Sequence, residues 1–268
     1  MTEVNRKRTW TMRPNTQRAA KAGETYALLL AEARRLFGSA GYSAVGVRDI
    51  TEAARVSRGA LAHHFGGKEE LFLRVFLEIE QDIANAAAHP GKDLTGLDAL
   101  DRFRAGVETY LDAASHNETQ RISFIDGPAV LGWQRWRSLE EDFYLGMMIK
   151  SMERAAAEGA IISLPPRTLA LMIFGSVTEA ALMIAHASDP QKKRREAGFV
   201  LDRFFCGLRT GGSVRSPGAA SPPARPDKSQ LAHQNSPGET LWEDRYRNRT
   251  DVLNGNEEAP CHVNNSSK

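Results

Sequence analysis

The side chains best suited to chemistry in this 268-residue chain gather between Val47 and Lys68, in the run VRDITEAARVSRGALAHHFGGK. The run combines cations, a hydroxyl group and very small side chains. An Arg fork can pair with guanine, a hydroxyl or a methyl group can meet other base edges, and a cation can meet a phosphate. These residue types therefore indicate recognition of DNA by hydrogen bonding and charge. The residues that we assign to this role are Arg48, Ser57, Arg58, Gly59, Ala60, His63 and Lys68.

The spacing of apolar residues in the same run predicts how these side chains are positioned. Apolar residues recur at helical spacing in two short segments on either side of a tight turn, which is the pattern of a helix-turn-helix. The opposite face of the second helix carries small residues beside Arg58, so this face can approach base edges in the major groove. We expect Arg58 to contact a base edge, and His63 and Lys68 to contact phosphates. The apolar positions are Val47, Ile50, Ala54, Val56, Leu61 and Phe65.

The segment from Tyr26 to Leu77 resembles the DNA-binding head of the TetR family of one-component transcriptional regulators. The resemblance implies a three-helix head over residues 24–70, followed over residues 71–209 by an all-helical domain that binds an effector and forms the dimer. It implies an operator in double-stranded DNA and a small-molecule effector as partners. The matching positions, all in one register, are Phe37, Gly41, Tyr42, Ile50, Ala53, Val56, Ser57, Gly59, Leu61, His64, Phe65, Lys68, Glu69 and Leu71.

The chain departs from the family pattern at three positions. Gly46 stands where many members carry a Ser or Thr that caps the helix and faces a phosphate, and Gly offers no hydroxyl. Ala62 replaces a Tyr, so we expect one phosphate contact to be lost there. Gly67 replaces a polar cap, although the backbone amides that follow it, together with Lys68, can still hold a phosphate.

The sequence offers little support for an enzyme. It contains no Gly-x-Gly-x-x-Gly turn, no Walker phosphate loop, no His-Glu-x-x-His and no Glu-x-x-His pair. His63 and His64 are adjacent, so on a helix they point about 100° apart and make a poor metal pair. We therefore expect no catalytic residue, cofactor or metal site, and we assign His64 to packing or capping.

Composition is typical of a cytoplasmic protein with one globular region and tails. Apolar residues make up 41% of the chain, only two Cys occur, and neither a signal peptide nor a membrane span is evident. The net charge is only +2, but residues 1–23 hold six cations and one acid. We expect this segment to be a flexible basic arm. Either it crosses the phosphate backbone or enters the minor groove, or its charges are merely solvated.

The rest of the globular region reads as a series of helices without strand-like alternation, which predicts an all-α fold. The expected third body helix ends where Gly127 and Pro128 interrupt the pattern. Residues 210–268 contain six of the twelve prolines and few apolar residues, so we expect a disordered tail. The expected body helices are 68–88, 98–115, 118–125, 133–158, 167–187 and 191–208.

The last two expected helices are the candidate dimer interface. The first is apolar nearly all round, which predicts burial on more than one side. The resemblance implies that the pair forms a four-helix bundle with its symmetry mates. The alternative is that both helices fill the core of one subunit. On the final helix the apolar stripe is Ala197, Leu201, Phe204, Phe205 and Leu208.

An effector site is expected between Ser123 and Met148, with help from the helix that faces it. Aromatic and Met-rich walls with a few polar groups suit an amphipathic molecule, although such a stripe is also typical of plain core. Glu179 lies in a strongly apolar stretch and needs a partner, which can be a neighbouring residue, the symmetry mate or a ligand. The candidate residues are Phe124, Asp126, Trp133, Trp136, Phe143, Met147, Glu179 and Met183.

Together these patterns predict a homodimeric, ligand-responsive DNA-binding regulator that acts as a repressor on a palindromic operator. The alternative is a helical dimer that binds a small molecule and whose head has lost specific DNA affinity. The sequence identifies neither the effector, the operator, the controlled genes nor the sign of control.

Overall fold

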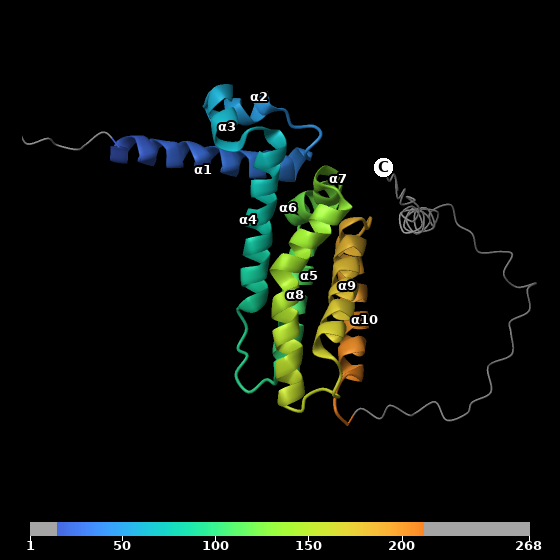
Figure 1. Ribbon diagram of the computed structural model, residues 1–268. Helices are drawn as coiled ribbons and strands as arrows, with labels where there is room; N and C mark the ends of the chain where they lie inside the picture. Colours follow the sequence, from blue (N-terminus) through green and yellow to red (C-terminus); the bar gives the residue numbers. More distant parts are fainter. Residues whose placement is uncertain (1–14, 212–268) are drawn as a thin grey trace, which may run out of the picture. The chain divides into compact units, whose positions relative to one another are not determined.

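The computed structural model describes residues 15–211, and the regular structure of this part is helical (Figure 1). Most of the expected arm, and all of the expected tail except residues 210 and 211, lie outside these residues. The all-α prediction is confirmed for the described part, where an isolated bridge between Ile161 and Arg209 is the only β pairing. The helices are α1 (Asn15–Ala40), α2 (Val47–Ala53), α3 (Arg58–Phe65), α4 (Lys68–Ala88), α5 (Ala99–Ala114), α6 (Asn117–Thr119), the π-helix η1 (Gln120–Asp126), α7 (Gly127–Leu131), α8 (Trp133–Ala157), α9 (Pro166–Ala185) and α10 (Pro190–Gly207).

The head consists of α1, α2, α3 and the first turns of α4 (Figure 1). The apolar residues predicted for the helix-turn-helix face inward: Ile50, Leu61 and Phe65 are buried. Tyr26 of α1 stacks on Phe65 with ring centroids 4.7 Å apart. Burial of this aromatic and aliphatic cluster fixes α3 against α1 and leaves the other face of α3 free for a partner.

The first helix begins earlier than the sequence predicted. Residues 15–23, which we expected in a flexible arm, belong to α1. The segment has no Pro or Gly before Gly23, and it is rich in Ala and long polar side chains that favour helix. The flexible-arm prediction is therefore wrong for residues 15–23.

The body is a bundle in which α4 descends from the head and packs against α5 and α8, while α9 packs against α8 and α10 (Figure 1). By length and composition α9 can cross a membrane, the one described helix of which this is true. Its most apolar window is 61% buried inside the protein. That burial is the property of a core helix, and it agrees with the predicted contacts on more than one side.

The segment after α6 does not stop at Gly127 and Pro128 as predicted. The chain continues through η1 into α7. Pro128 is tolerated because it occupies the first turn of α7, where its missing N–H has no helical partner to lose. Gly127 lies against Trp136, and a Cβ placed there would be 3.0 Å from the indole ring. Close packing, rather than helix termination, explains this glycine.

Candidate nucleic-acid interface and ligand cavity

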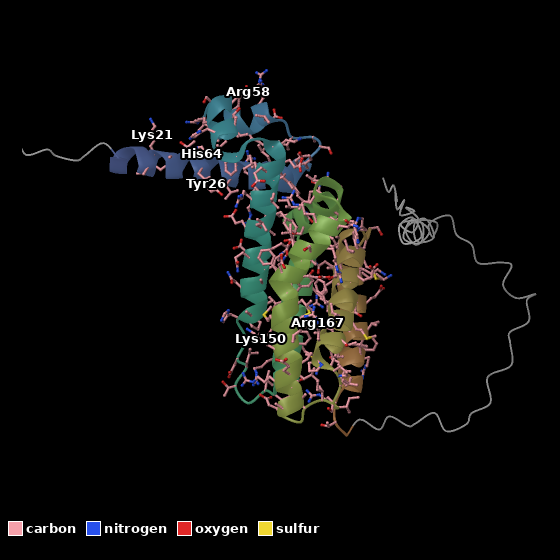
Figure 2. The ribbon with its side chains drawn as sticks, viewed as in Figure 1. Lys21, Tyr26, Arg58, His64, Lys150 and Arg167 are labelled. Atoms are coloured by element: carbon pink, nitrogen blue, oxygen red, sulfur yellow. The ribbon has the colours of Figure 1, made fainter. Side chains whose placement is uncertain are left out.

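The outer face of α3 gathers the predicted base-reading residues. Ser57 caps the helix by accepting a hydrogen bond from the Ala60 backbone N–H at 3.2 Å. Arg58, Gly59 and His63 are exposed beside it. Figure 2 shows Arg58 at the outer end of the head, directed away from the bundle. The face thus combines one long cationic side chain with a surface of small residues, which a major groove can accept.

His64 turns inward instead. Its ring lies edge-on to Tyr26 with centroids 6.2 Å apart, between α1 and α3 (Figure 2). This contact gives His64 the packing role that we expected for it. His63, the exposed neighbour, stays available for a phosphate.

The start of α2 is capped in a way that compensates for Gly46. Asp49 Oδ2 accepts a hydrogen bond from the Gly46 backbone N–H at 2.8 Å, so one half of a capping box is present. Arg48, on the exposed side of α2, forms an ion pair with Glu52 at 2.6 Å. An exposed pair of this kind contributes little stability, so the Arg48 guanidinium can leave Glu52 for a DNA phosphate.

Lys68 has an internal role that the sequence did not predict. Its ammonium group donates to the carbonyl oxygens of Tyr42 at 3.0 Å and Val45 at 2.9 Å. It also lies 3.9 Å from the centroid of the Tyr42 ring. Two of its three N–H donors therefore hold the loop between α1 and α2. This arrangement differs from the expected phosphate contact, because the charge is already engaged inside the head.

Asp126, a predicted ligand residue, joins the head to the body. Its Oδ2 accepts a hydrogen bond from the Tyr42 backbone N–H at 2.7 Å. Arg121 of η1 lies 3.8 Å from the same carboxylate. A second connection comes from Arg34 of α1, which pairs with Glu118 at 3.0 Å. Residues of α6 and η1 are therefore in direct contact with the head.

A cavity of about 270 Å³ opens in the body between α4, α5, α8 and α9. Its walls are mostly apolar, with two tyrosines and two arginines as the main polar exceptions. This size lies near the lower end of the range for small-molecule sites. The lining residues are Ala87, Ala88, Leu94, Ala99, Arg102, Phe103, Gly106, Val107, Tyr110, Tyr144, Met147, Met148, Ser151, Arg154 and Val177.

Among the predicted ligand residues, Met147 lines this cavity. Phe124 and Trp136 are core residues with almost no exposed surface. Trp136 donates through Nε1 to the Ser123 carbonyl at 2.9 Å, which ties α8 to η1. Phe143 is partly buried and packs against the same core. These aromatic side chains follow the core alternative that the sequence left open.

The remaining predicted ligand residues lie near or on the surface. Trp133 is 43% exposed and packs on Trp136 with ring centroids 5.0 Å apart. Glu179 and Met183 are exposed on α9. The acid is therefore not enclosed by its own apolar helix. The effector site predicted around Ser123–Met148 overlaps the cavity only at Tyr144, Met147 and Met148.

The body also contains a buried pair of acids, of which sequence reasoning did not single out Glu80. Glu80 of α4 and Glu140 of α8 are both fully buried. The Tyr144 hydroxyl donates to Glu80 at 2.7 Å, and the Tyr110 hydroxyl donates to Glu140 at 3.3 Å. Burial raises the pKa of both carboxyl groups. The signal for Glu80 was present, because it continues the buried spacing of Phe76 along α4 by one helical turn.

The exposed sides of α9 and α10 form an apolar face. Phe199, Val200 and Met172 are 62%, 65% and 63% exposed, respectively. In the stripe expected on the final helix, Leu201, Phe205 and Leu208 are buried in the core of the same chain, which is the alternative that the sequence left open for them. Only Phe204 of that stripe is well exposed. Helical periodicity identified the stripe but could not show which side faces the bundle.

Within the described residues, no group of three or more His, Cys, Asp or Glu side chains is placed to hold a metal ion. The arrangement offers a basic helix face, an apolar cavity with polar groups at its ends, and contacts that connect the two regions.

Comparison with known proteins gives matches to both parts of the chain. Residues 29–75 match the family described as bacterial regulatory proteins, tetR family. Residues 100–208 match the tetracyclin repressor-like C-terminal domain. The transcriptional repressor KstR2 of Mycobacterium tuberculosis is 36% identical over 111 residues, which cover 37% of this chain and 56% of the repressor. The chain thus spans little more than half the length of that relative.

Longer matches extend the likeness over the described region. The transposon Tn10 TetC protein of Escherichia coli is 24% identical over 186 residues, covering 69% of this chain and 92% of TetC. A solved TetR-family transcriptional regulator from Pectobacterium atrosepticum is 31% identical, with a TM-score of 0.64 over 71% of this chain and 97% of that one. With both domains matched and nearly all of that regulator covered, this chain belongs to the TetR family of transcriptional regulators.

Proposed function

We propose that the protein is a homodimeric cytoplasmic repressor that binds a palindromic operator and releases it when a small molecule enters the body. The observation that carries this proposal is the outer face of α3, where Arg58 projects from a surface of small residues. An Arg at this place can form a bidentate pair with guanine, while Ser57 and His63 meet other edges and phosphates. The proposal includes no catalytic step, cofactor or metal.

The dimer is supported by the apolar face of α9 and α10. Exposed side chains as large as Phe199 and Met172 are costly to leave in water when they adjoin one another. A twofold contact through this face buries the patch of each copy against the other. Glu179 lies on the same side of α9 as Met172 and Met183, at helical spacing, so a basic side chain of the second copy can serve as its partner.

Control requires a ligand that prefers the arrangement of the dimer that does not bind DNA, since equal affinity for both arrangements shifts nothing. The cavity borders α4, whose first turn belongs to the head. A second route runs through η1, because Asp126 holds the Tyr42 backbone. Movement of either element changes the separation of the two recognition helices and spoils their register on successive major grooves.

The test is a mobility-shift assay with fragments selected by the purified protein, at several salt concentrations. Arg58→Ala should relax the base preference at one position of each half-site and cost about 1–3 kcal/mol. Arg135→Ala, which removes an exposed Arg of α8 far from α3 in the sequence, is the matched control and should leave binding unchanged. Identical base preferences for Arg58→Ala and the parent protein would show that Arg58 does not read a base.

The second candidate is a small-molecule-binding dimer with a degenerate head. Ala62 is exposed where a phosphate-binding Tyr was expected, and Lys68 is engaged with the Tyr42 and Val45 carbonyl groups. Both observations reduce the number of phosphate contacts. Uniformly weak, strongly salt-dependent binding to every fragment would favour this candidate.

A further inference from the structure

The buried acid pair of the body has more acceptor capacity than its surroundings use. Oε1 of Glu80 and Oε1 of Glu140 are both buried and have no hydrogen-bond partner among the described residues. The buried hydroxyl group of Ser123 lies beside Glu80, and the two carboxyl groups lie beside one another, so the pair shares a proton rather than a cation. Unsatisfied polar atoms in a protein interior cost free energy, so a cluster of them at one place needs an explanation.

No cationic side chain is free to form an ion pair with these two acids in the described structure. Among the groups that act on Glu140, Arg137 of α8 is the one positive charge. Its guanidinium lies 4.0 Å from the centroid of the Phe174 ring, and its Nε lies 3.3 Å from Glu141. Arg137 is therefore held by other partners, and the acid pair has no ion pair within hydrogen-bonding distance in the described structure.

The acid pair lies directly behind the cavity wall. Tyr110 and Tyr144 line the cavity, and their hydroxyl groups are the ones that reach Glu140 and Glu80. The carboxyl groups do not themselves line the cavity, so a ligand reaches their oxygens only when one of these tyrosines rotates. The two rings meet edge-to-face, with centroids 5.1 Å apart, and together close this end of the cavity.

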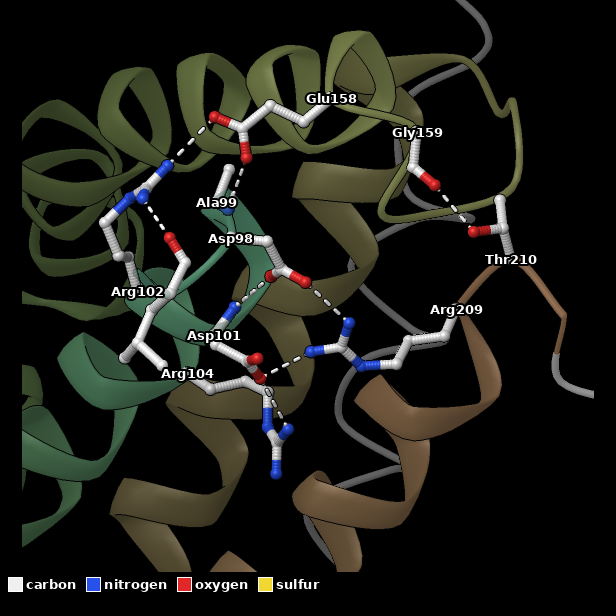
Figure 3. A network of polar contacts seen from close by, with 10 residues as sticks. Asp98, Ala99, Asp101, Arg102, Arg104, Glu158, Gly159, Arg209 and Thr210 are labelled. Carbon is white, nitrogen blue, oxygen red and sulfur yellow. Dashed lines mark hydrogen bonds and ion pairs between the residues drawn. The ribbon is translucent and has the colours of Figure 1, made fainter. Parts of the chain in front are cut away.

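The other end of the cavity is basic, with two arginines that share a single carboxylate. Arg102 and Arg154 line it, and both pair with Glu158, at 2.9 and 2.8 Å. Figure 3 shows Arg102 against Glu158, which also accepts a hydrogen bond from the Ala99 backbone at 2.7 Å. From Arg102 to Tyr110 the cavity follows two turns of α5, a length of about 12 Å. The site is thus an apolar cavity with two arginines at its outer end and the acid pair behind two tyrosines at its inner end.

We propose that this cavity binds a molecule with an apolar body and one protonated amine, and that Glu80 and Glu140 hold the ammonium group. The inference rests on the proposed function and names the chemical class of the effector. An ammonium group brings three donors and one positive charge, which suit the free oxygens of the two carboxyl groups and the neighbouring tyrosine hydroxyls. The apolar walls hold the rest of the molecule.

Other ligand classes fit the same cavity less well. A carboxylate at the inner end meets two acids, and at the outer end it competes with Glu158 for the two arginines. A neutral alcohol can bond to a tyrosine hydroxyl, but it cannot compensate a buried negative charge. Charge therefore selects among ligands of equal apolar length.

The test titrates the full chain with octylamine, octan-1-ol and octanoate by calorimetry. We expect octylamine to bind at least about tenfold more tightly than the other two probes, because only its ammonium group can donate a charge-assisted hydrogen bond to the acid pair. Because the carboxyl pair retains a proton before binding, octylamine should also displace a proton. The buffer takes up this proton, so the measured heat of binding depends on the ionisation enthalpy of the buffer.

Variants locate the selectivity at the acid pair. The double change Glu80→Gln and Glu140→Gln should lower octylamine affinity about tenfold or more and leave octan-1-ol unchanged. Glu141→Gln, a change at the neighbouring residue that is outside the pair, is the matched control. Equal binding of the three probes, tighter binding of octanoate, or full octylamine affinity in a folded double variant would overturn the inference. If the double variant unfolds, probe selectivity and proton release in the parent chain decide it.

A DNA-binding assay separates this inference from the proposed function. If the chain selects octylamine but retains no DNA, the amine-binding site is supported and the proposed repressor function is contradicted. If it retains operator DNA but shows no selectivity for the amine, the proposed repressor function is supported and the amine-binding site is contradicted.

Discussion

The backbone N–H of Tyr42 donates a hydrogen bond to Oδ2 of Asp126 across 2.7 Å, and so joins the loop of the head to the junction of η1 and α7. The carbonyl oxygen of the same Tyr42 accepts from Lys68 at the start of α4. Tyr42 of the head is thus held by residues of both η1 and α4, the two elements that lead toward the body cavity. Ser123, the fourth residue of η1, lies beside the buried Glu80.

Asp126→Ala should weaken the communication between ligand and DNA. The change removes a charge-assisted hydrogen bond worth about 1.5–3 kcal/mol, so the head no longer follows η1. We expect octylamine to bind as tightly as before but to release less operator DNA. Parallel calorimetry and mobility-shift titrations measure the two quantities. Asp142→Ala, on an exposed position of α8, is the control, and equal DNA release by Asp126→Ala and Asp142→Ala would contradict the coupling.

Lys68→Met should destabilise the head without altering the salt dependence of DNA binding. Two carbonyl groups lose a charged donor, at a cost of about 1–3 kcal/mol, while the number of phosphates contacted stays the same. Thermal unfolding measures the first effect, and the slope of affinity against salt measures the second. Arg48→Ala is the contrasting variant, because its exposed guanidinium should reduce that slope with little change in stability. A smaller salt dependence for Lys68→Met would instead support the phosphate contact that the sequence predicted for Lys68.

The acid pair should make the protein less stable as pH rises above the acidic range. Burial raises the folded-state pKa of Glu140 and Glu80 above the usual value of 4.5. Between that value and the raised pKa, the folded chain keeps a proton that the unfolded chain has lost. The free energy of unfolding is thus greatest below the usual pKa. As pH rises from there to the folded-state pKa, it falls by about 1.4 kcal/mol per pH unit for each such proton.

Thermal unfolding between about pH 5 and pH 8 measures this dependence. Glu140→Gln should flatten the profile and raise the melting temperature at the upper end, because it removes a buried group that resists ionisation. Arg137 opposes the raised pKa only in part, and the Tyr110 and Tyr144 hydroxyls titrate far above this window. Glu141→Gln should retain the parent profile. The same slope in Glu140→Gln and the parent would show that other groups dominate.

Phe199→Glu with Val200→Glu should give a folded monomer that has lost operator affinity. Both side chains are exposed in the single chain, so the charges disrupt contact between copies and leave the core intact. Native mass measurement reports the assembly, and circular dichroism reports the fold. Leu201→Glu, one position further along and buried, should instead unfold the body. A dimer that survives the double change would place the interface elsewhere.

The sequence by itself determined the helical fold and the reading face of the head. Ile50, Leu61 and Phe65 recur at helical spacing, so their burial leaves Arg58 and His63 on the opposite side. This is local information, because a helix of known phase sets the direction of each of its side chains. The TetR resemblance extended it to the body, where the helices lie close to the expected ranges.

Only the tertiary structure decided which residues meet across helices. Lys68 reaches carbonyl groups more than twenty positions earlier in the chain, and Tyr110 reaches Glu140 thirty positions later. No periodicity records such pairings, since they depend on how whole helices pack. The same reason explains why Asp126 joins the head, why Trp136 lies in the core, and why Phe199 rather than Leu201 faces outward. Spacing predicts the face of a helix, but packing determines its neighbour.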